Sequence, residues 1–136
     1  MIEAHISQLM QDLELGVPSD KDTQGFYSIQ LNEDILVYIK SLDPGMYFKS
    51  NIILCPTKDK ETLFTLLLKA NFLGLSTGGA TIGLDKDEKY LTLSRAIPYD
   101  INYKSFKEII EDFANYLDFW EQEVKRHQTA AEQGIL

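Results

Sequence analysis

Apolar residues recur every three to four positions in three segments of the chain, and this spacing predicts three amphipathic helices. The first is expected from residue 2 to a break at Gly16. The second is expected from about Asp59 to Leu73, with Gly74 at its C-cap. The third opens at a capping-box pair, Ser105 and Glu108. Its apolar stripe comprises Phe106, Ile109, Ile110, Phe113, Leu117, Trp120 and Val124.

Alternation of apolar and polar residues, bounded by turn-forming residues, predicts five short strands. They are expected over residues 27–31, 35–40, 50–55, about 80–85 and about 89–96. The element order is then αβββαββα. This order is typical of the α+β class, and we expect a twisted, mostly antiparallel five-stranded sheet with three helices.

Length, composition and charge restrict the class of protein. A chain of 136 residues that is 44% apolar fits one folded domain, expected over residues 1–126 with a frayed C-terminal tail over 127–136. A formal net charge of -8 argues against binding to nucleic acid, which requires a basic surface. The N-terminus has no signal-peptide pattern, and no apolar run approaches the ~20 residues of a membrane span. We therefore expect a cytoplasmic protein without membrane insertion.

The second predicted helix is apolar on almost every side, which is more than one small sheet can cover. A twofold homodimer would bury the remainder. The residues expected at this dimer interface are Leu63, Phe64, Leu66, Leu67 and Ala70. The alternative is a helix buried wholly within one subunit.

The first strands also carry apolar residues on both faces. If Ile29 and Val37 face the core, then Phe26, Leu36 and Tyr38 point the other way, because side chains of a strand alternate. Met46, Tyr47 and Phe48, expected in a loop, add to this surplus. Exposed apolar patches mark binding sites. The alternative is that the first helix or a loop covers them.

Residues with catalytic or metal-binding chemistry are scarce. His5 and His127 have no Cys or His neighbour at ligand spacing, and both are expected to be solvated. Cys55, the only cysteine, lies in an apolar run and is expected to be a buried thiol. The segment 85–88 lacks the glycine and distal glutamate of a calcium loop, and the glycines within 76–81 are followed by no phosphate-binding lysine. We expect no catalytic residue, no metal site and no cofactor.

Three segments together resemble the central signature of class I type III secretion chaperones, the CesT/SycE-like family. They are residues 70–74 (ANFLG), 78–85 (GGATIGLD) and 91–95 (LTLSR). The resemblance implies a homodimer in the bacterial cytoplasm that has no enzymatic activity. It implies binding to the N-terminal chaperone-binding segment of secreted effectors, in extended form, which keeps that segment soluble and competent for secretion. The glycines then serve close backbone packing and no ligand.

In this family the second helix contributes to the dimer, and cargo occupies apolar grooves formed by the first helix and the sheet. The resemblance and the apolar surplus together predict a cargo-binding set of Met10, Leu13, Phe26, Leu36 and Tyr38. The secretion ATPase is a further candidate partner. Two other functions stay open: a non-secretory regulatory or binding module of the same fold, and a small enzyme with an unfamiliar site.

Overall fold

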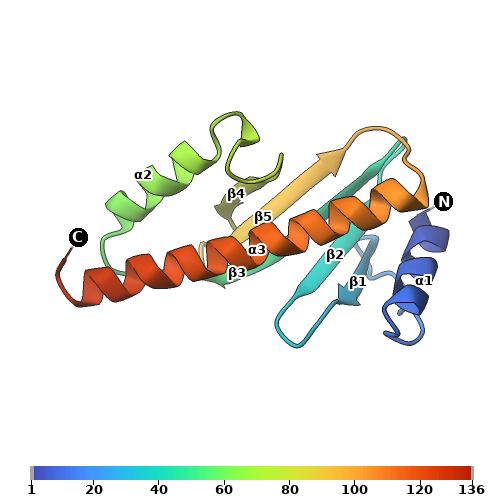
Figure 1. Ribbon diagram of the computed structural model, residues 1–136, viewed down its shortest axis with the longest axis horizontal. Coiled ribbons are helices and arrows are strands. Elements are labelled where there is room, and N and C mark those ends of the chain that lie inside the picture. The colour runs from blue at the N-terminus through green and yellow to red at the C-terminus, as the bar shows by residue number, and fades with distance from the viewer. Residues whose placement is uncertain (1, 136) are drawn as a thin grey trace. The chain divides into compact units, whose positions relative to one another are not determined.

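The structure, a computed structural model, describes residues 2–135 and contains the predicted elements in the predicted order (Figure 1). A single turn of 3-10 helix, η1, is added after the second helix. The elements are α1 (Ile2–Asp12), β1 (Phe26–Gln30), β2 (Leu36–Ser41), β3 (Met46–Leu54), α2 (Lys60–Ala70), η1 (Phe72–Gly74), β4 (Thr81–Leu84), β5 (Tyr90–Ile97) and α3 (Tyr103–Glu132). The αβββαββα order and the α+β class are confirmed.

The five strands form one sheet in the order β1-β2-β3-β5-β4. The pairs β1–β2, β2–β3 and β4–β5 are antiparallel. In the first pair Ile29 lies opposite Val37, and both side chains are buried. The alternation seen in the sequence therefore sets which face of each strand is buried.

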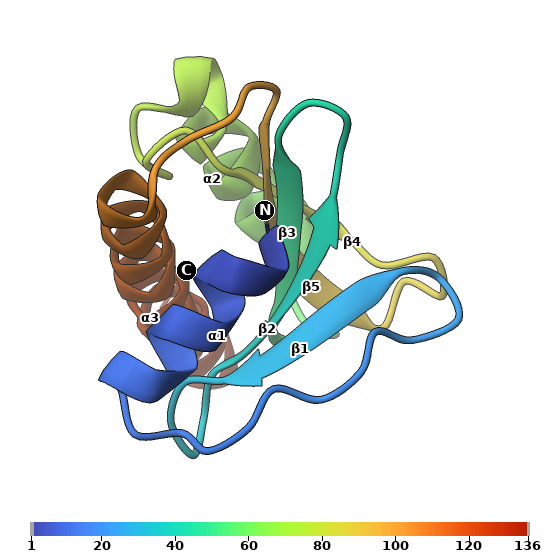
Figure 2. The same ribbon diagram turned by 90° about the vertical axis from the view of Figure 1, so that its right-hand side faces the viewer.

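The chain packs as two compact units, and β3, β5 and α3 contribute to both. The first unit holds the residues up to Ser50 together with Arg95–Glu111. The second holds Asn51–Ser94 and the chain from Asp112 onward. In the first unit α1 lies beside β1 and β2 (Figure 2). Its buried core includes Ile6, Leu9, Ile29, Val37, Ile39, Phe48, Phe106 and Ile110. The core of the second unit includes Leu63, Leu67, Ile82, Leu91, Leu93, Leu117, Trp120 and Val124.

Strand β3 begins earlier than the sequence predicted. Met46, Tyr47 and Phe48 belong to the strand and not to a loop, and Met46 and Phe48 are buried. The turn before them is tight because Gly45 has a φ of 98° and packs against the backbone of Ile97. A Cβ atom at Gly45 would lie 1.8 Å from the Ile97 carbonyl oxygen, so only glycine fits there.

Two predicted helix ends were wrong. Helix α2 ends at Ala70 and not at Leu73, whose φ of 55° is not helical. Asn71 is the C-cap residue, and its side chain forms hydrogen bonds with the backbone of Ile82. Helix α3 begins at Tyr103, ahead of the predicted capping box. The cap is Asn102, whose Oδ1 accepts a hydrogen bond of 2.9 Å from the Ser105 N–H.

The C-terminal helix also continues beyond the predicted start of the frayed tail at residue 127, because α3 ends at Glu132. Val124, His127 and Ala131 are buried, and their spacing extends the apolar stripe by two more turns. His127 is therefore not solvated as expected. Its Nε2 atom is buried and has no hydrogen-bond partner within the described chain.

Candidate binding surfaces

Three of the predicted cargo-binding residues share one surface on the first three strands. Phe26, Leu36 and Tyr38 alternate with the buried residues of β1 and β2, so they lie on the opposite, outer face of the sheet. All three are half-buried. Tyr47 joins them from β3, and its ring packs edge-on against Phe26 with the centroids 6.2 Å apart. We call the outer-face residues Phe26, Leu36, Tyr38, Lys40, Tyr47 and Lys49 the outer strand face.

Helix α1 does not cover the outer strand face. The hydroxyl of Tyr27 donates a hydrogen bond of 3.0 Å to the Glu3 carboxylate of α1, so α1 lies on the inner face, on the other side from Phe26. This bond raises the pKa of the Tyr27 phenol, while the pKa of Glu3 is lowered first by its own backbone N–H and then by Tyr27. Because α1 lies on the inner face, it leaves the outer strand face uncovered.

Two lysines carry charge onto this face. Lys40 Nζ lies 5.5 Å and Lys49 Nζ 4.4 Å from the centroid of the Phe26 ring, which is cation–π distance. The backbone of Phe26 is held by Asp22, because its N–H donates to Asp22 Oδ1 and its carbonyl accepts from the Asp22 N–H, at 2.9 and 2.8 Å. The ring of Phe26, whose backbone is held in place, thus lies close to two cationic groups.

The other two predicted cargo residues lie elsewhere. Met10 is on the buried side of α1 and is only 7% exposed, so it has little surface to offer a ligand. Leu13 follows the end of α1 and is 41% exposed. The structure therefore places Phe26, Leu36 and Tyr38 on one face of the sheet, and it places Met10 and Leu13 on and just after α1, apart from that face.

The five residues predicted at the dimer interface fall into a buried group and a more exposed group, according to which side of α2 they occupy. Leu63, Leu67 and Ala70 point inward and are buried by the chain itself. Phe64 is half-buried, and Leu66 is 39% exposed. Only these last two retain surface for a partner. The alternative, a helix buried wholly within one subunit, is wrong, because one side of α2 is exposed to solvent.

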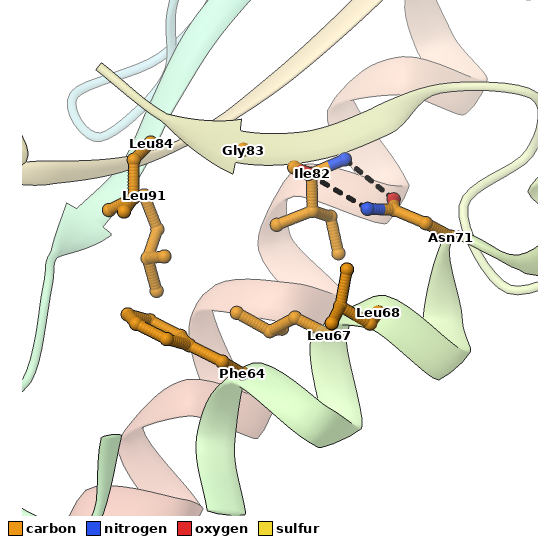
Figure 3. Close-up of a pocket in the computed structure, with 8 residues that line it drawn as sticks. All are labelled: Phe64, Leu67, Leu68, Asn71, Ile82, Gly83, Leu84 and Leu91. Carbon is orange, nitrogen blue, oxygen red and sulfur yellow. Dashed lines mark hydrogen bonds between the residues drawn. The ribbon is translucent and has the colours of Figure 1, made fainter. Parts of the chain in front are cut away.

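The open side of α2 carries a residue that the sequence prediction missed. Leu68 is 72% exposed and lies one helical turn after Phe64. These two residues and β4–β5 enclose an apolar groove of about 230 Å³. Figure 3 shows its lining: Phe64, Leu67, Leu68, Asn71, Ile82, Gly83, Leu84 and Leu91. We call it the α2–β4 groove.

Apolar exposure continues from the groove along the chain. Leu68 and Phe72 line one adjoining hollow, and Phe72, Leu73 and Leu75 are all exposed. These residues follow the end of α2, where the sequence prediction had placed the last helical turn. Had the end of α2 been predicted at Ala70, the exposure of these residues could also have been predicted, because they would no longer belong to the buried stripe of a helix.

The glycine-rich segment forms a tightly packed loop. Gly74 and Gly78 both have positive φ, and a Cβ atom on Gly78 would lie 2.3 Å from the Tyr116 ring of α3. The Trp120 indole N–H donates a hydrogen bond of 2.9 Å to the Ser76 carbonyl. Close packing therefore explains these glycines, Gly78 against the Tyr116 ring of α3 and Gly74 against the backbone of Gly79, in agreement with the sequence interpretation.

Titratable side chains in the first unit serve packing. His5 is half-buried and stacks on Phe106, and its Nε2 donates to the Ile101 carbonyl at 2.9 Å, so the expectation of a solvated histidine was wrong. Burial, together with a hydrogen bond to Asp12, raises the pKa of Tyr103 to about 12.

In the second unit, Cys55 is only half-buried, and that burial raises the pKa of its thiol.

Residues 2–135 contain neither a cluster of metal-ligating side chains nor a helix that could span a membrane. No three His, Cys, Asp or Glu side chains gather closely enough there to hold a metal ion. Among the helices that the structure describes, none combines the length and apolar character needed to cross a membrane.

Comparison with known proteins identifies the family. The family described as Tir chaperone protein (CesT) matches residues 5–121, which is most of the chain. The chain belongs to the CesT family. The resemblance to class I type III secretion chaperones is therefore confirmed. The CesT family is a family of chaperones, and no enzymatic site is implied by membership.

Individual proteins and solved structures are also similar to this CesT-family chain. A Chlamydia pneumoniae protein, CPj0713/CpB0740, is 25% identical over 122 residues, covering 88% of this chain and 93% of the relative. The solved ExsC–ExsE complex contains a chain with a TM-score of 0.69 at 16% identity, covering 89% of this chain and 91% of that one. A chain of the HopA1–SchA chaperone–effector complex gives a TM-score of 0.65 at 15% identity, covering 89% of this chain and 93% of that one. These two structures share the fold.

Proposed function

We propose that this CesT-family chain is a homodimeric chaperone for type III secretion. It binds the N-terminal chaperone-binding segment of one or more secreted effectors in extended form, in the bacterial cytoplasm, and keeps that segment soluble and competent for secretion. The observation that carries the proposal is the family match over residues 5–121. The proposed role uses no cofactor and no catalysis, and it leaves the secretion ATPase as a candidate later partner.

The apolar surface of the second unit supports the dimer. Leu68, Phe72 and Leu84 border the α2–β4 groove and its adjoining hollow, and each is exposed in the protomer. A contiguous apolar surface of this kind is unusual on a monomer and marks an interaction site. A second copy of the chain, related by a twofold axis, would cover the same surface on both subunits at once. We therefore move the proposed interface from the buried residues of α2 to Phe64, Leu68 and Phe72; Leu66, the other exposed residue of the predicted set, lies apart from this surface among Glu61, Thr62, Thr65 and Lys69.

The outer strand face supports the cargo site. Its half-buried aromatic and aliphatic side chains offer apolar contacts, and β1 lies at the edge of the sheet, where an extended segment can add a strand. Ordering a flexible segment costs about 2–5 kcal/mol, whereas each large apolar side chain buried gains about 1.5–3 kcal/mol. Several such contacts are needed, and Phe26, Leu36 and Tyr38 supply three.

The test is affinity purification of the chain from its native cell, followed by identification of the copurifying proteins. We expect one or more secreted proteins, and we expect Leu36→Asp with Tyr38→Asp to abolish their recovery because both contacts become charged. Matched control variants are Val17→Asp and Leu54→Asp, which place the same charge on exposed apolar residues away from the outer strand face.

Recovery of a secreted protein that is equal in both pairs of variants would refute the placement of the cargo site, provided that both variants stay folded and dimeric. Absence of any secreted protein, combined with a monomeric mass in solution, would refute the proposed function as a whole. A copurifying protein that is not secreted would favour the alternative, a regulatory or binding module of the same fold.

A further inference from the structure

The two lysines of the outer strand face are unusual in a chain with 21 acidic and 13 basic residues. Acidic groups are in excess, so a cation would be expected to find a carboxylate partner. Within residues 2–135, neither Lys40 nor Lys49 forms a salt bridge, and the ammonium group of each lies over the Phe26 ring. Both side chains are half-buried.

Protection of a sheet edge does not account for these lysines. Lysines are common on edge strands, where they prevent pairing with other chains. Lys40 is on β2 and Lys49 on β3, and both of these strands have a neighbour on each side. The cations therefore stand within the sheet, beside the aromatic contacts proposed for cargo, and not at its edge.

The register brings cationic and aromatic groups into one small area. Phe26 lies opposite Lys40, which lies opposite Tyr47, while Tyr38 lies opposite Lys49. Both ammonium groups are within 5.5 Å of the centroid of one ring. A ligand that contacts this ring must therefore place its neighbouring groups next to two positive charges that pair with no carboxylate among residues 2–135.

We propose that the outer strand face selects cargo segments in which carboxylate side chains accompany apolar ones. The apolar side chains contact Phe26, Tyr38 and Tyr47, and the carboxylates pair with Lys40 and Lys49. In an extended segment, side chains two residues apart point to the same side about 7 Å from each other, so one face can present both kinds of group. The inference rests on the proposed function and adds the chemistry of the cargo.

The test measures binding of the full chain to three fluorescent peptides by anisotropy. The probe repeats Leu-Leu-Glu-Glu over about twelve residues, which puts leucine and glutamate on both faces of an extended chain. The second peptide replaces every glutamate with glutamine, and the third replaces it with lysine. Exposed ion pairs are individually weak, so two of them predict a preference of about five- to thirty-fold for glutamate over glutamine. The lysine peptide should bind least.

Two double variants assign the preference to this surface. Lys40→Gln with Lys49→Gln should bind the glutamate and glutamine peptides equally, with an unchanged melting temperature. Lys58→Gln with Lys86→Gln changes the net charge equally at two exposed positions elsewhere and should keep the full preference. Equal binding of the two peptides by the unmodified chain, a preference that survives loss of Lys40 and Lys49, or no binding of any peptide would overturn the inference.

The outcomes separate this inference from the proposed function. If secreted proteins copurify from the native cell while the peptides show no charge preference, the chaperone function stands and the charge selection is wrong. If no secreted protein copurifies and the peptides show no charge preference, both the proposed function and the charge selection are wrong.

Discussion

Replacement of Leu68 by aspartate should convert the proposed dimer into a monomer. Leu68 is 72% exposed in the protomer, and its full burial would remove most of that surface from water. Burying a leucine side chain gains about 2 kcal/mol, so the exposed portion corresponds to about 1.5 kcal/mol in each subunit. A twofold interface contains the residue twice, and the loss of burial alone costs about 3 kcal/mol. The dissociation constant should therefore rise roughly a hundredfold.

The aspartate adds a second penalty, because the two new carboxylates must lose water in an apolar interface. Sedimentation velocity across a range of concentrations measures the effect directly. The matched control is Val17→Asp, which makes the same kind of change at a residue that is 88% exposed and lies outside α2. It should leave the dissociation constant unchanged.

The reasoning would be refuted by a Leu68→Asp variant that dimerises as tightly as the unmodified chain. An unmodified chain that remains monomeric at high concentration would refute it as well. A variant that unfolds would be recognised by its circular dichroism, and Leu68→Ala then provides the milder test, with a loss of about 2 kcal/mol and no added charge.

Three further predictions concern local structure. Gly78→Ala should lower the free energy of unfolding by about 2–4 kcal/mol in urea titrations, because positive φ and the Tyr116 ring both oppose a Cβ; Gly16→Ala, with open space around it, should cost only about 1 kcal/mol. Asn71→Ala removes two hydrogen bonds to the β4 backbone and should cost about 1–3 kcal/mol. Tyr103→Phe should delete the phenol that titrates near pH 12 in absorbance measurements. Since its folded pKa is raised from 10, the stability it contributes is present below pH 10 and is lost as the pH rises through about 12.

Local patterns in the sequence predicted most of the fold, because burial follows the spacing of apolar residues. The inner residues of β1 and β2 and the stripe of α3 are buried where the periods of two and of three to four place them. The ends of elements depend on contacts between distant parts of the chain. Just after the end of α2, Asn71 bonds to Ile82, and just before the start of β3, Gly45 packs on Ile97. No local pattern contains these contacts.

The candidate surfaces were predictable only in part for the same reason. Phe26 and Tyr38 followed from alternation along single strands, whereas the approach of Lys40 and Lys49 to Phe26 depends on the register between three strands. Leu68 was missed because an almost wholly apolar helix gives no indication of which side faces the core. Packing within the second unit determines which side of α2 faces the core, and that packing cannot be read from the helix sequence.

The exposed groove of the protomer has a consequence for the synthesis of the protein. If a second copy covers Leu68 and Phe72, each newly made chain presents them to the cell until it meets its partner. Pairing is a second-order process, so its rate rises with the square of the chain concentration, while degradation of the unpaired chain rises only in proportion. Below a threshold level of expression, most copies would be lost to proteases before assembly. The steady-state amount of protein should then increase more steeply than the dose of its gene.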